Sequence, residues 1–133
     1  LHGVQEKVQF MGKLPPEQLR QFIRKAWAGI TLFEATGKSN YFSLANRFFD
    51  YIQAGIPQIC VDFPAYRALN NYHAVAVLVN TVEPEHLARE LNRLNTDREL
   101  YEELSRQCLL ARKALNWDRE KNKLLDLYHS LFR

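Results

Sequence analysis

Residues 74–79 read AVAVLV, and this unbroken apolar run limits what the chain can fold into more than any other segment. A strand with one face in water alternates apolar and polar side chains, whereas this run does not alternate. Such a run is typical of a strand that is covered on both faces, as strands are in a parallel sheet. The run therefore predicts a parallel β-sheet packed against helices.

Other short apolar segments, bounded by glycine, proline or polar residues, predict strands at residues 8–12, 29–33 and 57–62. Between the strands, apolar residues recur at helical spacing, which predicts helices over residues 15–27, 42–55 and 66–69. Gly55 is expected to end the second of these helices in a left-handed conformation.

Three further helices are predicted toward the C-terminus, beginning near residues 83, 96 and 116. Thr96 and Glu99 have the spacing of a capping box at the start of the middle one. Strands that alternate with helices in this way predict an α/β fold. We expect a Rossmann-like parallel sheet with helices on both faces and a helical C-terminal end.

The composition fits one small globular domain. The chain has 133 residues, of which 47% are hydrophobic and 25% charged, so it can bury a core. Its 18 Lys and Arg exceed its 15 Asp and Glu by three, and the two signs are mixed along the chain. This mild excess does not indicate a nucleic-acid-binding protein.

The residue types used in metal, redox and nucleotide-hydrolysis chemistry lack the spacing which that chemistry requires. Cys60 and Cys108 form no CxxC pair, and the 4 histidines form no HExxH motif. Glycine-rich loops of the GxGxxG and Walker types do not occur. We therefore predict no metal, no cofactor and no catalytic thiol, with both cysteines as small core residues.

A polar stretch, residues 34–46, follows the second predicted strand and is longer than a strand-to-helix connection needs. Parallel sheets bind ligands beyond the carboxyl ends of their strands, and the first turn of a helix offers free N–H groups to an anion. Ser43, Asn46, Arg47 and Asp50 are predicted to share one helical side, with Ser43 about 10 Å from Asp50 along the axis. We predict a diphosphate at the helix start and a ribose held by the Asp50 carboxylate.

Residues 40–57, NYFSLANRFFDYIQAGIP, resemble the donor-site segment of bacterial glycosyltransferases with the two-Rossmann-domain (GT-B) fold, of the group 1 or glycogen-synthase-like family. In that family the segment reads approximately N-y-S-L-P-N-K-l-F-E-Y-x-A-A-G-I-P. Further matches at the family's spacing lie at residues 8–12, 17–19, 62–64, 87–88 and 116–118, so the resemblance covers nearly the whole chain.

The resemblance implies that residues 1–133 are a single partial donor-nucleotide-binding domain, the C-terminal half of a GT-B fold without its first strands. It implies that Asp50 binds the ribose hydroxyls, and that residues 43–46 hold the diphosphate largely through backbone N–H groups. The full set of expected nucleotide-sugar-binding residues is Glu34, Lys38, Ser43, Leu44, Ala45, Asn46, Arg47 and Asp50.

The sequence departs from the family pattern at several positions. Asp50 stands where Glu is commoner, Arg47 where Lys is frequent, and Ala45 where Pro is frequent. Phe42 occupies the position of the first of two glutamates that some relatives carry, so a carboxylate contact to the donor sugar is not expected from there.

The function that the resemblance implies is transfer of a sugar from a nucleoside-diphosphate sugar to a glycan or lipid-linked acceptor, as in polysaccharide biosynthesis, with no metal required. The acceptor would bind an N-terminal domain absent from this sequence, so we expect the chain alone to be inactive. Two alternatives stay open: a non-catalytic binding or assembly module of the same fold, and a sugar-nucleotide epimerase. An exposed sheet edge would also allow a homodimer.

The chain begins without an initiator methionine or a signal-peptide pattern, so we expect a piece of a longer bacterial protein. The apolar run at residues 74–79 is far shorter than the ~20 residues of a membrane span, and the cysteine usage fits the cytoplasm. Peripheral contact with the inner membrane face stays open as an alternative, although acidic residues lie among the basic side chains concerned: Arg106, Arg112, Lys113, Arg119, Lys121 and Lys123.

Overall fold

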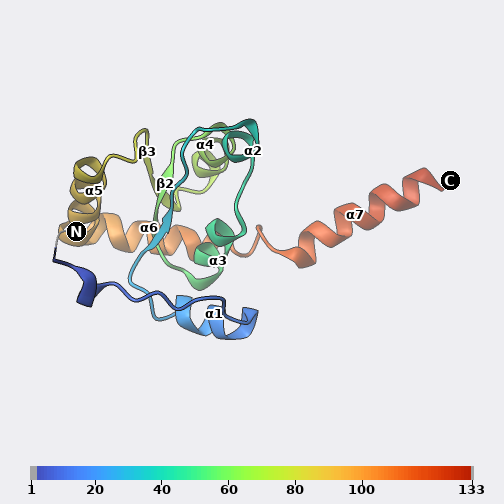
Figure 1. Ribbon diagram of the computed structural model, residues 1–133. Coiled ribbons are helices and arrows are strands. Elements are labelled where there is room, and N and C mark those ends of the chain that lie inside the picture. Colours follow the sequence, from blue (N-terminus) through green and yellow to red (C-terminus); the bar gives the residue numbers. More distant parts are fainter. Residues whose placement is uncertain (1–2, 133) are drawn as a thin grey trace.

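The computed structural model describes residues 3–132, and its centre is a sheet of three parallel strands (Figure 1). The strands lie in the order β1 (Gly29–Thr31), β2 (Gln58–Val61) and β3 (Ala76–Val79). The predicted α/β class and the parallel sheet are confirmed, and three of the four predicted strands are present.

Helices connect and flank these strands. Within the described residues they are the short 3-10 helix η1 (Gln5–Lys7) and the α-helices α1 (Pro16–Ile23), α2 (Lys38–Phe42), α3 (Asn46–Ala54), α4 (Pro64–Tyr72), α5 (Pro84–Thr96), α6 (Arg98–Ala111) and α7 (Trp117–Leu131).

The core lies around β2, the central strand, in which every side chain is buried. Phe48 and Ile52 of α3 and Tyr66 of α4 belong to this core, together with a cysteine from β2 and a cysteine from α6. Both Cys60 and Cys108 are fully buried, as predicted, and burial raises the pKa of each thiol to about 12. Thiols that resist ionisation to this extent are poor nucleophiles at neutral pH.

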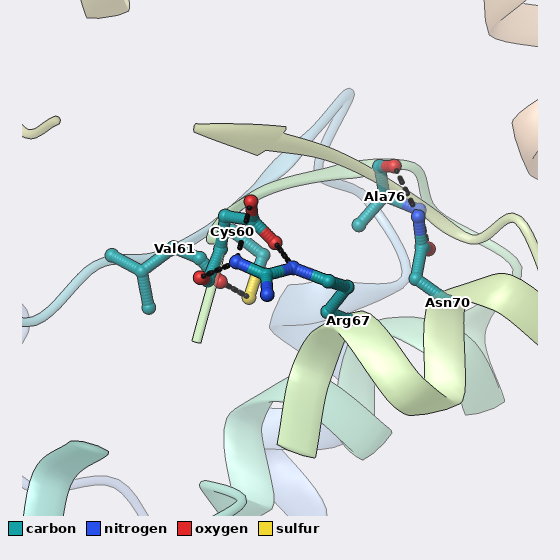
Figure 2. A network of polar contacts seen from close by, with 6 residues as sticks. Cys60, Val61, Arg67, Asn70 and Ala76 are labelled. Atoms are coloured by element: carbon teal, nitrogen blue, oxygen red, sulfur yellow. Dashed lines mark hydrogen bonds and ion pairs between the residues drawn. The ribbon is translucent and has the colours of Figure 1, made fainter. Parts of the chain in front are cut away.

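The unbroken apolar run lies at one edge of the sheet, in β3, and not at its centre. Val77 and Leu78 of this strand are half-buried, whereas Ala76 and Val79 are buried. A side chain from α4 fixes the start of this strand. The Oδ1 atom of Asn70 accepts the N–H groups of Val75 and Ala76 at 2.9 and 3.0 Å. Its Nδ2 atom donates to the Ala76 carbonyl at 3.2 Å, the bond that Figure 2 shows.

A buried polar network ties β1, β2 and α3 together. Gln58 is fully buried, and its Oε1 atom accepts the hydroxyl of Thr31, also fully buried, at 2.8 Å. The Nε2 atom of Gln58 donates to the carbonyl of Phe48 at 3.0 Å. Both ends of the amide are thus satisfied, which avoids the ~1–3 kcal/mol that an unpaired buried polar group costs.

Two glycines allow α3 to pack as it does. A Cβ atom at Gly29 would lie 2.4 Å from the ring of Tyr51, so the absence of a side chain lets α3 lie against β1. Gly55 ends α3 with φ 76°, which confirms the predicted left-handed cap.

The prediction of a strand at residues 8–12 is wrong. These residues have no regular structure and are exposed, with Phe10 94% exposed. An alternating pattern becomes a strand only where a neighbouring strand supplies hydrogen bonds, and none of the described strands pairs with this segment.

Helix boundaries also differ from prediction. The helix predicted over residues 15–27 ends at Ile23. The predicted capping box is replaced by Asp97, whose side chain accepts the N–H of Leu100 at 2.9 Å, whereas Thr96 is the last residue of the preceding helix and donates its hydroxyl to a carbonyl there. Asp and Thr compete for the N-cap position, and Asp is the stronger N-cap.

The last helix extends away from the sheet (Figure 1). It starts where the sequence predicts, because the Asn116 side chain accepts the N–H of Arg119 at 3.1 Å. Its apolar side chains are exposed, with Leu127 57% and Leu131 68% exposed. This helix therefore adds no fully buried side chain to the core of the described residues.

Thr31→Val tests the polar network. The change removes a buried hydroxyl donor and leaves the Oε1 atom of Gln58 without a partner, so the free energy of unfolding should fall by about 1–3 kcal/mol. Urea unfolding followed by circular dichroism measures this. Thr36→Val, in an exposed loop, is the matched control and should change stability by less than about 0.5 kcal/mol. Equal effects of the two substitutions would contradict the role of the network.

Candidate functional site

Helix α3 carries several of the predicted site residues, and it begins later than predicted. It starts at Asn46, with Ala45 as its N-cap in extended conformation. Ser43 lies outside this helix, as the exposed residue that follows α2, so the prediction that it shares a helical side with the other residues is wrong. Phe42 is 63% exposed at the end of α2, whereas Phe48 of α3 is fully buried in the core.

The segment before α3 is held by a bond to the core. The N–H of Ala45 donates to the hydroxyl of Tyr66 at 2.9 Å. Tyr66 is fully buried, and burial raises the pKa of its hydroxyl. This bond occupies one N–H group that was predicted to hold a diphosphate. The N–H groups of Asn46 and Arg47, in the first turn, have no acceptor within the helix and are the groups that can reach an anion.

Asp50 lies on the side of α3 that faces α1. It lines a cavity of about 260 Å³, the α1–α3 cavity, whose other lining residues are Arg20, Ile23, Arg24, Gln53 and Ala54. Arg20 lies on α1, and Arg24 is the C-cap residue of that helix in helical conformation; because the two arginines are four residues apart, they share one side of the helix. The residues that line this small space thus include one acidic, two basic and one amide residue.

The charge of Asp50 is set by two opposing effects. Burial raises the pKa of its carboxyl above the ordinary value of 3.8, and the positive charge of Arg20 lowers it. Burial has the larger effect, and the side chain is half-buried. A ligand that donates hydrogen bonds to this carboxylate would favour its charged form further.

The remaining predicted residues lie elsewhere. Glu34 lines a cavity at the end of the sheet, and Lys38 lines a small cavity beside α2. Asn46 lines a cavity of about 640 Å³ between α3 and the start of α7. Leu44 is half-buried and packs against the core. The structure therefore does not bring the predicted residues around one cavity.

Sequence reasoning missed Arg20 and Arg24. The apolar stripe of their helix predicts only its buried side, and their four-residue spacing was the available signal that they lie together. Nothing in the sequence says that this side of α1 meets Asp50, because that contact depends on how two helices pack.

A second cavity lies over the carboxyl ends of the three strands, and we call it the rim cavity. Its volume is about 520 Å³. Its lining residues end or follow a strand, or lie on α2 and α4; they are Phe33, Glu34, Ala35, Tyr41, Val61, Asp62, Phe63, Arg67, Val79, Asn80, Thr81 and Val82. The guanidinium of Arg47, from the first turn of α3, lies 4.7 Å from the centroid of the Phe33 ring, which is one of these lining residues.

An ion pair stabilises one wall of the rim cavity. The Nε atom of Arg67 donates to Asp62 Oδ1 at 2.7 Å, and its Nη2 atom donates to Oδ2 at 2.9 Å and to the Asp62 carbonyl at 3.0 Å. Figure 2 shows Arg67 reaching from its helix toward the end of β2. This fork fixes the turn that joins β2 to α4.

Among residues 3–132, no group of three or more His, Cys, Asp or Glu side chains is placed to hold a metal ion. His2 lies outside the described residues. In the same part of the chain, no helix combines the length and the apolar character needed to cross a membrane.

Comparisons with protein-family models, with curated proteins and with solved structures find no match to this chain. The chemistry of the cavities is therefore the basis for assigning a function.

Asp50→Asn tests the burial of the carboxylate. A raised pKa means that the folded state holds this proton more tightly than the unfolded chain does. The group therefore contributes stability below pH 3.8, and this contribution is lost as the pH rises through the raised pKa. We expect Asp50→Asn, which stays neutral, to be more stable than the parent at neutral pH, with the difference vanishing at a pH of about 3.

Urea midpoints at the two pH values measure this difference. Asp126→Asn, on the exposed α7, is the matched control and should leave the midpoint unchanged at both. An Asp50→Asn protein that is less stable than the parent at neutral pH would show that attraction to Arg20 outweighs burial.

Proposed function

We propose that this chain is the donor-binding part of a glycosyltransferase and binds a nucleoside-diphosphate sugar, with the ribose at Asp50. The observation that carries the proposal is the lining of the α1–α3 cavity by Asp50, Arg20 and Arg24. A carboxylate accepts hydrogen bonds from the two adjacent hydroxyls of a ribose, and guanidinium groups donate to phosphate oxygens. The cavity thus combines the two chemistries that a nucleotide requires.

The size of this cavity indicates which part of the ligand it would hold. About 260 Å³ is below the ~300–1,000 Å³ of sites that enclose a whole drug-sized ligand. The cavity would therefore take the ribose and the adjoining phosphate. The second phosphate would lie toward the first turn of α3, since Asn46 precedes Asp50 by four residues, which is about 6 Å along the helix axis.

The proposal includes a finer description of the fold, as the C-terminal half of a GT-B fold. Three parallel strands in sequential order, joined by helices, are consistent with half of a doubly wound sheet. The resemblance of residues 40–57 to the family's donor segment supports the same reading. A separate acceptor domain would present the glycan or lipid-linked acceptor. The arginines and the first turn of α3 would stabilise the departing diphosphate without a metal.

A non-catalytic binding or assembly module of the same fold is the second candidate. Two observations favour it. The N–H of Ala45 is already bonded to Tyr66, and the residues predicted to bind the donor surround different cavities. A domain that retains the fold but has lost the site would have both features.

A nucleotide panel separates the two candidates. We expect one of UDP, GDP, ADP and CMP to raise the melting temperature of the full chain and to bind in calorimetry. Asp50→Ala and Arg20→Ala should each weaken that binding about tenfold or more, since a hydrogen bond to a charged group contributes ~1.5–3 kcal/mol.

The matched controls for this panel are Asp126→Ala and Arg119→Ala on α7, which should bind as the parent does. If a folded parent binds none of the four nucleotides, the assembly module is the better description. If Asp50→Ala binds the nucleotide as tightly as the parent does, the ribose does not bind in the α1–α3 cavity.

A further inference from the structure

We infer that the rim cavity is a second binding site and that its ligand is a neutral saccharide. Its volume of about 520 Å³ falls within the ~300–1,000 Å³ of sites that enclose small molecules. It opens where all three parallel strands end, which is the position at which open α/β sheets hold ligands. Of the residues that line this cavity, only Glu34 is among the nucleotide-sugar-binding residues predicted from the sequence.

Part of the wall of this cavity is aromatic. The rings of Tyr41 and Phe63 lie with their centroids 4.9 Å apart and their planes at 47°, and Phe33 adds a third ring. The C–H groups on one face of a pyranose ring are apolar and pack against aromatic rings, while the hydroxyls at its edge need polar partners. An aromatic wall beside polar groups therefore suits a sugar better than a purely apolar ligand.

The polar part of the lining mixes donors and acceptors. The carboxylates of Glu34 and Asp62 accept, the Asn80 amide both donates and accepts, and the Thr81 hydroxyl does the same. Each sugar hydroxyl is at once a donor and an acceptor, so a saccharide can satisfy both kinds of group.

The arrangement of charge favours a neutral ligand. Arg67 is the one arginine in the lining, and Asp62 already engages it through two side-chain bonds of 2.7 and 2.9 Å. A phosphate entering the cavity would meet the carboxylate of Glu34 without a free guanidinium among the lining residues. The positive charge of Arg47 lies next to the Phe33 ring.

The inference does not depend on the proposed nucleotide site. No residue that lines the rim cavity also lines the α1–α3 cavity. Substitutions in one cavity can therefore be examined without changing the chemistry of the other, and either site can fail alone. If both sites are occupied, the chain holds a sugar beside a nucleotide.

Saturation-transfer NMR on the full chain tests the inference, with D-glucose, D-galactose, D-mannose, N-acetyl-D-glucosamine, maltose and lactose as the probes. We expect at least one of these saccharides to bind, with a Kd in the millimolar range. Tyr41→Ala should weaken binding about fivefold to tenfold, because it removes one ring of the aromatic wall. Asn80→Ala, at an exposed residue, is the second variant and should weaken binding as well.

Tyr72→Ala is the matched control for the loss of a tyrosine, since Tyr72 is 87% exposed and does not line the cavity. It should bind the saccharide as the parent does, and so should Asp50→Ala. The inference is overturned if no saccharide binds, or if binding survives unchanged in both Tyr41→Ala and Asn80→Ala. A parent chain that binds a saccharide but none of the four nucleotides would disprove the proposed function alone.

Discussion

The position of α3 depends on one buried amide. Gln58, at the start of the central strand, accepts a hydrogen bond from Thr31 on one neighbouring element and donates one to the Phe48 carbonyl on another. Because that carbonyl belongs to the first turn of α3, the amide fixes the helix against the sheet as well as joining two strands. Once Phe48 and Ile52 face the core, Asp50 is turned toward α1. The geometry of the candidate nucleotide site therefore follows from a polar contact that binds no ligand itself.

The sequence predicted those parts of the fold that depend on local pattern. The apolar run of residues 74–79 and the two apolar segments before it identified the three strands, and Gly55 identified the end of α3. The strand expected at residues 8–12 failed because a strand also needs a neighbour, and alternation of side chains does not supply one. The apolar run predicted the most buried strand of the sheet, but it lies at an edge of the sheet. The fully buried strand is β2, which contains a glutamine.

The candidate site was less predictable because its geometry depends on contacts between elements. Spacing along one helix placed Asp50 correctly on α3, but the start of that helix depends on a hydrogen bond from Ala45 to Tyr66, 21 residues away. Ser43 therefore fell outside the helix that the periodicity predicted for it. Arg20 and Arg24 meet Asp50 only through the packing of α1 against α3, which no pattern within either segment encodes.

The two cavities differ in the state of their arginines, and this difference is the reason why we propose a different ligand for each. In the rim cavity, Arg67 donates two hydrogen bonds to the carboxylate of Asp62, so its charge stabilises the turn between β2 and α4. Among the described residues, no ion pair engages Arg20 or Arg24, so their guanidinium groups can pair with an external anion. Attraction from Arg20 also opposes the effect of burial on Asp50 and helps that carboxyl to stay ionised. For these reasons we propose a charged nucleotide for the α1–α3 cavity and a neutral sugar for the rim cavity, within one small α/β domain.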